Sequence, residues 1–169
     1  MVSETDPAAC QVPSLPRRLI SMVYEGLLLF AVAFIGTWVF FFVSGGRPAT
    51  GWLRIALQLH LAALFAAYFL WCWLRGGQTL AMKTWRIRLV APGRPAVPAD
   101  MALARLAYGA IFVGTFLVAI AGAFAHRNPW LAFVTLAVSG IGLGWALFDR
   151  DRQFLHDRLA GTRLVLVPR

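Results

Sequence analysis

Charged residues are scarce in this sequence, and acidic residues are the scarcest. The chain of 169 residues holds 7 Asp and Glu against 16 Lys and Arg, so its formal net charge is +9. Hydrophobic residues make up 60% of the chain, and its mean hydropathy is +0.70. A soluble domain of this length is not normally so apolar, so the composition indicates a membrane protein.

Cysteines are few, and recognisable catalytic motifs are absent from the sequence. The two cysteines, Cys10 and Cys72, lie in a polar tail and in an apolar run, and neither has a Cys or His at metal-ligand spacing. The chain has no HExxH motif, no nucleophile elbow and no Walker spacing. We therefore expect no disulfide framework, no metal site, no cofactor and no enzymatic activity.

Four apolar runs dominate the chain. They cover about residues 19–43, 52–74, 102–125 and 130–148, and a bilayer core takes roughly 20 helical residues. The first run is too long for the apolar part of a signal peptide, so it should stay as an anchor. The sequence thus predicts an all-α integral membrane protein with four transmembrane helices. The alternative has three spans, with residues 103–148 forming one span and a re-entrant piece.

Positive charges are distributed unequally about these runs. Of the 16 Lys and Arg residues, 13 lie before the first run, after the fourth run, or between the second and third runs, with the start of the third run included. The other three are Arg47, Arg54 and Arg127. By the positive-inside rule, both termini are cytoplasmic in a bacterial-type inner membrane. Residues 1–16 should form a disordered cytoplasmic tail and residues 17–168 the membrane domain. The expected partners are anionic lipid headgroups rather than nucleic acid, because no basic patch with spaced aromatics stands apart from the apolar runs.

Three segments outside the apolar runs are predicted to have regular structure. Residues 84–90 alternate apolar side chains with arginines, and residues 164–167 alternate leucines with valines. This period of two predicts short β-strands, which we expect to pair within a small cytoplasmic interfacial element. Residues 76–82 are predicted to form a short amphipathic helix among the headgroups.

Three motifs, in this order, resemble the RDD family of membrane proteins, which is named for one arginine and two aspartates. They are Arg17-Arg18 followed by an acid inside the first run, Gly77-Gln78-Thr79-Leu80 with the strand-like residues after it, and Leu155-His156-Asp157-Arg158-Leu159-Ala160-Gly161-Thr162-Arg163. The resemblance covers about residues 14–168.

The resemblance assigns family positions to three residues of this chain. Arg18 matches the family arginine, Glu25 takes the place of the first aspartate, and Asp157 is our choice for the second. Glu25 departs from the family pattern because its side chain is one carbon longer than that of aspartate. The resemblance implies a membrane domain, and some members of the family are suggested to act in ion transport, including sodium/proton exchange.

Ionisable residues inside the apolar runs need partners, because a charge in hydrocarbon costs about 2.5 to 3.5 kcal/mol on insertion scales. Glu25 and Arg105 enter their runs from the same side at comparable depth, so we hypothesise an ion pair between the first and third spans. His60 should be neutral and hydrogen-bonded to a neighbouring helix, and the alternative is a titrating relay with Glu25. Asp157 is expected to cap a helix or to pair with cytoplasmic arginines.

The sequence predicts a structural, assembly or partner-binding role that uses the basic cytoplasmic face. The alternative is an ion-coupled or proton-coupled transporter centred on Glu25 that acts as a homo-oligomer. Gly140 and Gly144 form a GxxxG pattern, which lets helix backbones approach closely. We expect this pattern to pack against the other spans, with a homodimer seam as the alternative.

Overall fold

The computed structural model describes residues 11–125, 129–149 and 153–167. Along these residues, two long helices are followed by a short helix and a strand, and this order then occurs a second time. In chain order they are α1 (Leu15–Val43), α2 (Trp52–Gly76), α3 (Leu80–Thr84), β1 (Ile87–Val90), α4 (Ala99–Ala125), α5 (Pro129–Phe148), α6 (Leu155–Leu159) and β2 (Arg163–Leu166). Each predicted apolar run lies within one long helix. Helix α2 begins at the first residue of its run, and the other three begin one to four residues before theirs.

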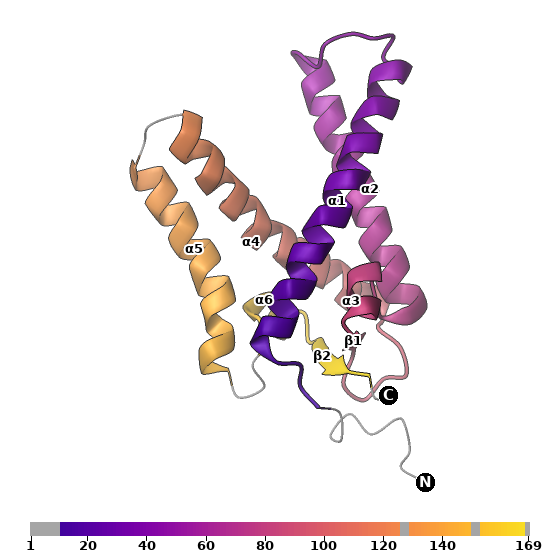
Figure 1. Ribbon diagram of the computed structural model, residues 1–169, viewed down its shortest axis with the longest axis vertical. Coiled ribbons are helices and arrows are strands. Elements are labelled where there is room, and N and C mark those ends of the chain that lie inside the picture. The colour runs from indigo at the N-terminus through magenta and orange to yellow at the C-terminus, as the bar shows by residue number, and fades with distance from the viewer. Residues whose placement is uncertain (1–10, 126–128, 150–152, 168–169) are drawn as a thin grey trace.

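The long helices form two antiparallel hairpins, α1 with α2 and α4 with α5 (Figure 1). The hairpins lean apart from a common end, where α2 meets α4 and where α3, α6 and both strands lie. This end, which we call the sheet end, contains the start of α1 and the whole of β2. The loop from α1 to α2 lies at the opposite end.

The two predicted strands pair, which confirms the small sheet. β1 and β2 run antiparallel, with Ile87 opposite Leu166 and Leu89 opposite Leu164. Ile87 and Leu89 are each 1% exposed, whereas Arg88 between them is exposed, so the period of two places the apolar side chains inward. They form a core with Trp73 of α2 and with the residues Met82, Val97, Ala102 and Leu164.

Gly77 ends α2 and allows the chain to turn back over the sheet. Its φ of +66° lies in the left-handed region, and its N–H donates to the Trp73 carbonyl over 3.0 Å. A Cβ at this position would lie 2.6 Å from the Leu89 carbonyl oxygen, so only glycine fits here. The short helix therefore begins at Leu80, later than the predicted residues 76–82, and its N-cap is Thr79.

The exposure of α1 is the reverse of that in a soluble helix. Its buried residues are Arg18, Ser21 and Gly36, whereas its exposed residues include many large apolar side chains, among them Leu27 and Phe30. A helix that is apolar all round must be covered by protein or by lipid, and the protein does not cover this one. Both α1 and α2 are long and apolar enough to cross a membrane.

The segment before α1 is tied to the C-terminal strand. The Gln11 carbonyl accepts a hydrogen bond from the Leu166 N–H over 2.9 Å, and Pro13 is fully buried. This differs from the predicted disordered tail of residues 1–16, because the backbone edge of β2 offers Gln11 a partner and α1 already begins at Leu15. Residues 1–10 lie outside the described part of the chain.

Candidate functional site

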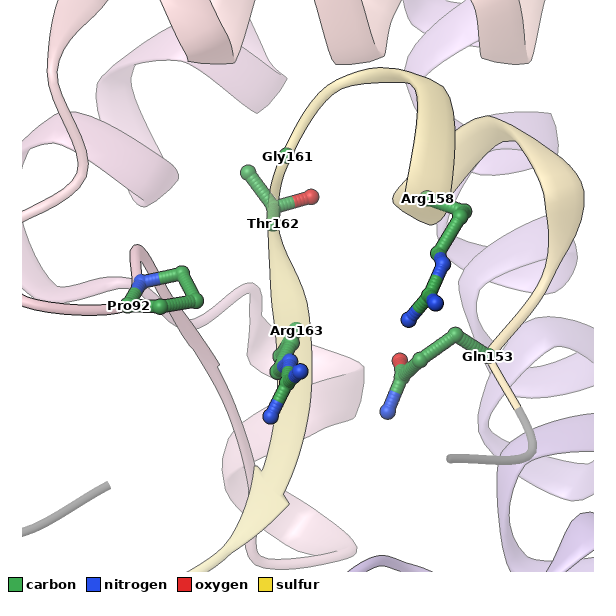
Figure 2. Close-up of a pocket in the computed structure, with 6 residues that line it drawn as sticks. All are labelled: Pro92, Gln153, Arg158, Gly161, Thr162 and Arg163. Atoms are coloured by element: carbon green, nitrogen blue, oxygen red, sulfur yellow. The ribbon is translucent and has the colours of Figure 1, made fainter. Parts of the chain in front are cut away.

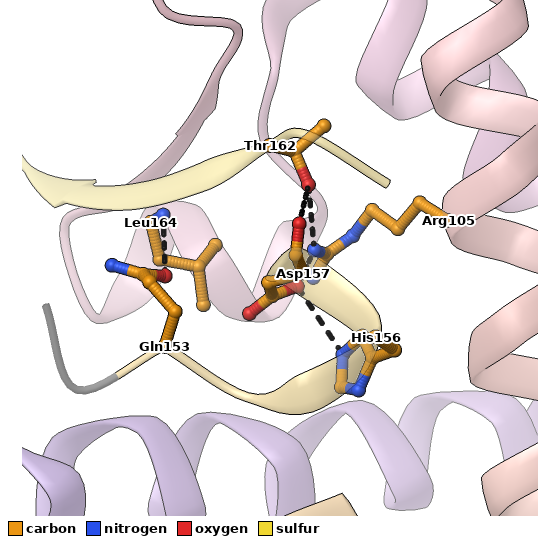
Figure 3. Close-up of polar contacts among 6 residues, drawn as sticks. All are labelled: Arg105, Gln153, His156, Asp157, Thr162 and Leu164. Carbon is orange, nitrogen blue, oxygen red and sulfur yellow. Dashed lines mark hydrogen bonds and ion pairs between the residues drawn. The ribbon is translucent and has the colours of Figure 1, made fainter. Parts of the chain in front are cut away.

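The first polar cluster joins α4 to the C-terminal segment through a buried ion pair. The Arg105 guanidinium contacts the Asp157 carboxylate, and these residues are 5% and 0% exposed (Figure 3). The Thr162 hydroxyl accepts a hydrogen bond from Arg105 Nη1 and donates one to the Asp157 carbonyl, each over 3.3 Å. The expectation that Asp157 pairs with an arginine therefore agrees with the structure, which identifies that arginine as Arg105.

His156 lies beside this ion pair as a neutral ring. Burial and, second, the charge of Arg105 lower the pKa of His156 to about 3. Its Nε2 lies 3.3 Å from Asp157 Oδ1, so we assign the ring hydrogen to Nε2, where it can donate to the carboxylate. Arg105 already neutralises Asp157, so the carboxylate does little to favour the imidazolium. One face of the ring stacks on Phe154, with 5.7 Å between the ring centroids.

Arg18 reaches the same region from the first turn of α1. It is 1% exposed, and its guanidinium carbon lies 5.8 Å from the centre of the Phe154 ring. The guanidinium is close enough to Arg105 for the two positive charges to repel each other. The residues that match the family arginine and the second family aspartate therefore both lie at the sheet end, where α1, α4 and α6 come together.

The second polar cluster surrounds Glu25 and joins α1 to α2 and α3. The Tyr68 hydroxyl donates to Glu25 Oε1 over 2.7 Å, and the Thr79 hydroxyl donates to Oε2. The same Thr79 oxygen accepts the Met82 N–H over 3.2 Å, as the N-cap of α3. Both carboxylate oxygens therefore have hydroxyl partners from other elements.

The hypothesis of a Glu25–Arg105 ion pair is wrong. Arg105 pairs with Asp157, and Glu25 accepts from Tyr68 and Thr79. The hypothesis rested on a comparable depth of the two residues within their apolar runs, but depth does not specify which neighbour a side chain faces. In the fold α1 contacts α2 and α3, whereas the part of α4 that carries Arg105 faces α6.

His60 lies far from both clusters. Its ring packs on Phe40 at 5.8 Å between centroids, and its Nε2 lies 3.8 Å from where a Cβ on Gly36 would be. Among the described residues Nε2 has no hydrogen-bond partner, so the predicted bond to a neighbouring helix is not found. Gly36 is about 16 Å of helical rise beyond Glu25, so His60, which lies beside Gly36, is at a different level of the fold from Glu25.

Sequence reasoning missed the hydroxyl residues that complete both clusters. Tyr68 is 43 positions from Glu25 along the chain, and a tyrosine inside an apolar helix gives no sign of its partner. Thr79 and Thr162 fall within the motifs that were recognised, and threonine before a short helix is an N-cap signal. No group of three or more His, Cys, Asp and Glu side chains that could hold a metal occurs within the described ranges.

Comparisons with known proteins identify the family of this chain. The model of the RDD family matches residues 12–161 of this chain. No curated protein and no solved structure matches it significantly. The family match and the apolar helices α1 and α2 together identify a membrane protein.

The Arg105–Asp157 pair should be the largest polar contribution to stability. Removing either partner leaves a buried charge, so Arg105→Met and Asp157→Leu should each lower the free energy of unfolding by about 3–5 kcal/mol. The double variant should lose less than the sum of the two. Unfolding in detergent, followed by tryptophan fluorescence, measures all three.

Asp100→Asn serves as the control because Asp100 is an exposed acid of the same helix. Its stability should stay within about 0.5 kcal/mol of the original chain. Single variants that are as stable as this control would contradict the assigned pair.

Proposed function

The chain belongs to the RDD family, and we propose that it is a multi-pass protein of a bacterial-type inner membrane with α1, α2, α4 and α5 as its spans. These helices have 29, 25, 27 and 20 residues, so each reaches at least the 30 Å or so of a bilayer core. The observation that carries this proposal is the exposure pattern of α1, which buries Arg18 and Ser21 and exposes several of its leucines and phenylalanines.

The charge distribution supports an orientation with the sheet end in the cytoplasm. Arg75, Lys83, Arg86 and Arg88 are all exposed at this end, and we call them the basic face. Arg47 and Arg54 lie at the opposite end, and Arg127 lies outside the described residues. Because α1 starts and β2 ends on the side of the basic face, this orientation makes both termini cytoplasmic.

Cysteine labelling in intact cells tests this topology. In a background with Cys10→Ser and Cys72→Ala, we introduce Thr50→Cys in the α1–α2 loop and Ala96→Cys in the β1–α4 loop. Both positions are exposed. A membrane-impermeant maleimide should label Thr50→Cys directly and should label Ala96→Cys only after permeabilisation. The reverse pattern, or labelling of both from outside, would rule the orientation out.

For the biochemical role, we propose that the protein is a structural or assembly component that binds partners and anionic headgroups through the basic face. The Arg75 guanidinium lies 3.7 Å above the Trp71 ring, and Trp71 is exposed. Aromatic and basic side chains together are typical of the headgroup level of a membrane. Arg88 lies in β1 and Arg86 directly precedes that strand, which favours defined contacts with an acidic partner surface.

Charge removal from the basic face tests this role. Arg86→Gln with Arg88→Gln should abolish the co-purification of partners cross-linked in native membranes, because it removes charges that face them. The matched control is Arg47→Gln with Arg54→Gln, which removes the same charge at the other end. Protein level and thermal stability should be unchanged in both. Equal retention of partners by the two double variants would argue against the basic face.

The arrangement around Glu25 supports transport as the second candidate function. Glu25 lies about 15 Å of rise from the start of α1, and three oxygen-bearing side chains meet there. An ionisable side chain within a membrane span is a candidate for an ion or proton pathway. This transporter would act as a homo-oligomer, and Gly140, which is exposed on α5, offers a place for a second copy to pack.

Glu25→Gln should abolish cation-driven proton flux in proteoliposomes, since the amide cannot exchange a proton. Glu25→Asp restores the family residue and should retain flux. Tryptophan fluorescence confirms that each variant is folded. If Glu25→Gln leaves the flux unchanged, Glu25 is not part of the proton pathway. If the original protein shows no flux, transport is excluded and the assembly role remains.

A further inference from the structure

A cavity of about 230 Å³ lies beside β2, separate from the carboxylate of Asp157. Its lining residues come from the C-terminal segment and from the loop after β1 (Figure 2). They are Pro92, Gln153, Arg158, Gly161, Thr162 and Arg163. No function described above uses this cavity.

The polar groups that face the cavity are mainly hydrogen-bond donors. Arg158 comes from α6 and Arg163 from β2, and Figure 2 shows both guanidinium groups near the Gln153 amide. Gln153 is 1% exposed, and its Oε1 accepts the Leu164 N–H over 3.1 Å. The amide oxygen is therefore occupied, and the NH₂ end is the part of Gln153 that can serve a ligand.

Charge in and beside the cavity favours an anion. Arg158 Nε lies 3.7 Å from Asp149 Oδ1, so among the described residues this carboxylate offsets one of the two guanidinium charges that line the cavity. Arg158, Arg163 and Gln153 also make other contacts within the chain. Guanidinium groups match phosphate oxygens through paired N–H donors.

We infer that this cavity binds a phosphate group through Arg158, Arg163 and the Gln153 amide. Its volume of about 230 Å³ is below the 300 Å³ or so at which pockets for drug-sized ligands begin, so it suits one phosphate better than a nucleotide. The phosphate is either free in solution or part of a lipid headgroup. This inference goes beyond the attraction of lipid by the basic face, because none of those residues lines the cavity.

The site is also joined to the buried ion pair. Thr162 forms part of the cavity wall, and its hydroxyl bridges Arg105 and the Asp157 carbonyl. Binding of phosphate would therefore stabilise the segment that carries Asp157, and ligand binding to the folded state raises the unfolding temperature.

Thermal unfolding of the full chain in phosphatidylcholine nanodiscs tests the inference. Potassium phosphate is titrated at constant ionic strength against potassium chloride, with tryptophan fluorescence as the readout. Phosphate should raise the unfolding temperature in a saturable way. Arg163→Gln and Arg158→Gln should each weaken the phosphate affinity about tenfold, because each removes a charge-assisted contact.

Arg54→Gln is the matched control, since it removes the same charge from an exposed position at the opposite end. Its phosphate affinity should be unchanged. If Arg163→Gln disturbs β2, Arg158→Gln still tests the site, because the Arg158 side chain is 50% exposed and replacing it leaves the core intact. A phosphate effect no larger than that of chloride, or affinities unaffected by both cavity variants, would overturn the inference.

A second series, in nanodiscs that contain phosphatidic acid and no free phosphate, identifies the source. Stabilisation by this lipid that is lost in Arg158→Gln supports a headgroup phosphate. Stabilisation by inorganic phosphate alone supports a free anion. Neither stabilisation experiment depends on the cysteine-labelling pattern or on proton flux. Failure of the phosphate site and failure of the proposed function are therefore distinguishable.

Discussion

The cost of leaving a charge buried without a partner dominates this structure. Arg105 and Asp157 are both buried, and they neutralise each other between α4 and α6. Since an unpaired buried charge costs several kcal/mol, the C-terminal segment must dock on α4 for either residue to be stable. Docking positions β2 beside β1, and the β2 edge then binds residue Gln11 before α1. One polar contact thereby brings both ends of the described chain to the sheet end.

Glu25 stabilises the α1–α2 hairpin because its carboxylate also needs partners, which here are neutral hydroxyl groups rather than an arginine. A carboxylate among apolar helices is stabilised when both oxygens accept hydrogen bonds, and Tyr68 and Thr79 supply them. This ties α1 to α2 and α3 at the level of the sheet end. Toward the opposite end the described contacts between α1 and α2 include apolar ones, such as His60 on Phe40 and the close approach at Gly36. Both polar clusters thus lie in the half of the fold where the hairpins meet.

The sequence was sufficient for the elements but not for the partners within the clusters. Helix length and the period of two in residues 84–90 and 164–167 are local properties, so the four long helices and the paired strands could be predicted. The partner of Glu25 depends on how each helix is rotated and on which helices are neighbours. The depth of a residue within its apolar run includes neither quantity, so a prediction from depth alone paired Glu25 with Arg105. Thr79 could have been predicted as an N-cap from the sequence around it, whereas no local sequence signal indicates that Tyr68 is a partner of Glu25.

The hydrogen bonds of Glu25 also explain why we place the assembly role before transport. To ligate a cation, Tyr68 and Thr79 would have to turn lone pairs toward it, and their hydrogens would need other acceptors. Thr79 already accepts the Met82 N–H, so its oxygen is fixed as the cap of α3 while its hydrogen points at Glu25. Releasing Thr79 would leave the first turn of α3 without its cap, at a cost of about 1 kcal/mol. The cluster is therefore arranged to hold a carboxylate in place, and a transported ion that displaced Thr79 would have to compensate for the loss of that cap.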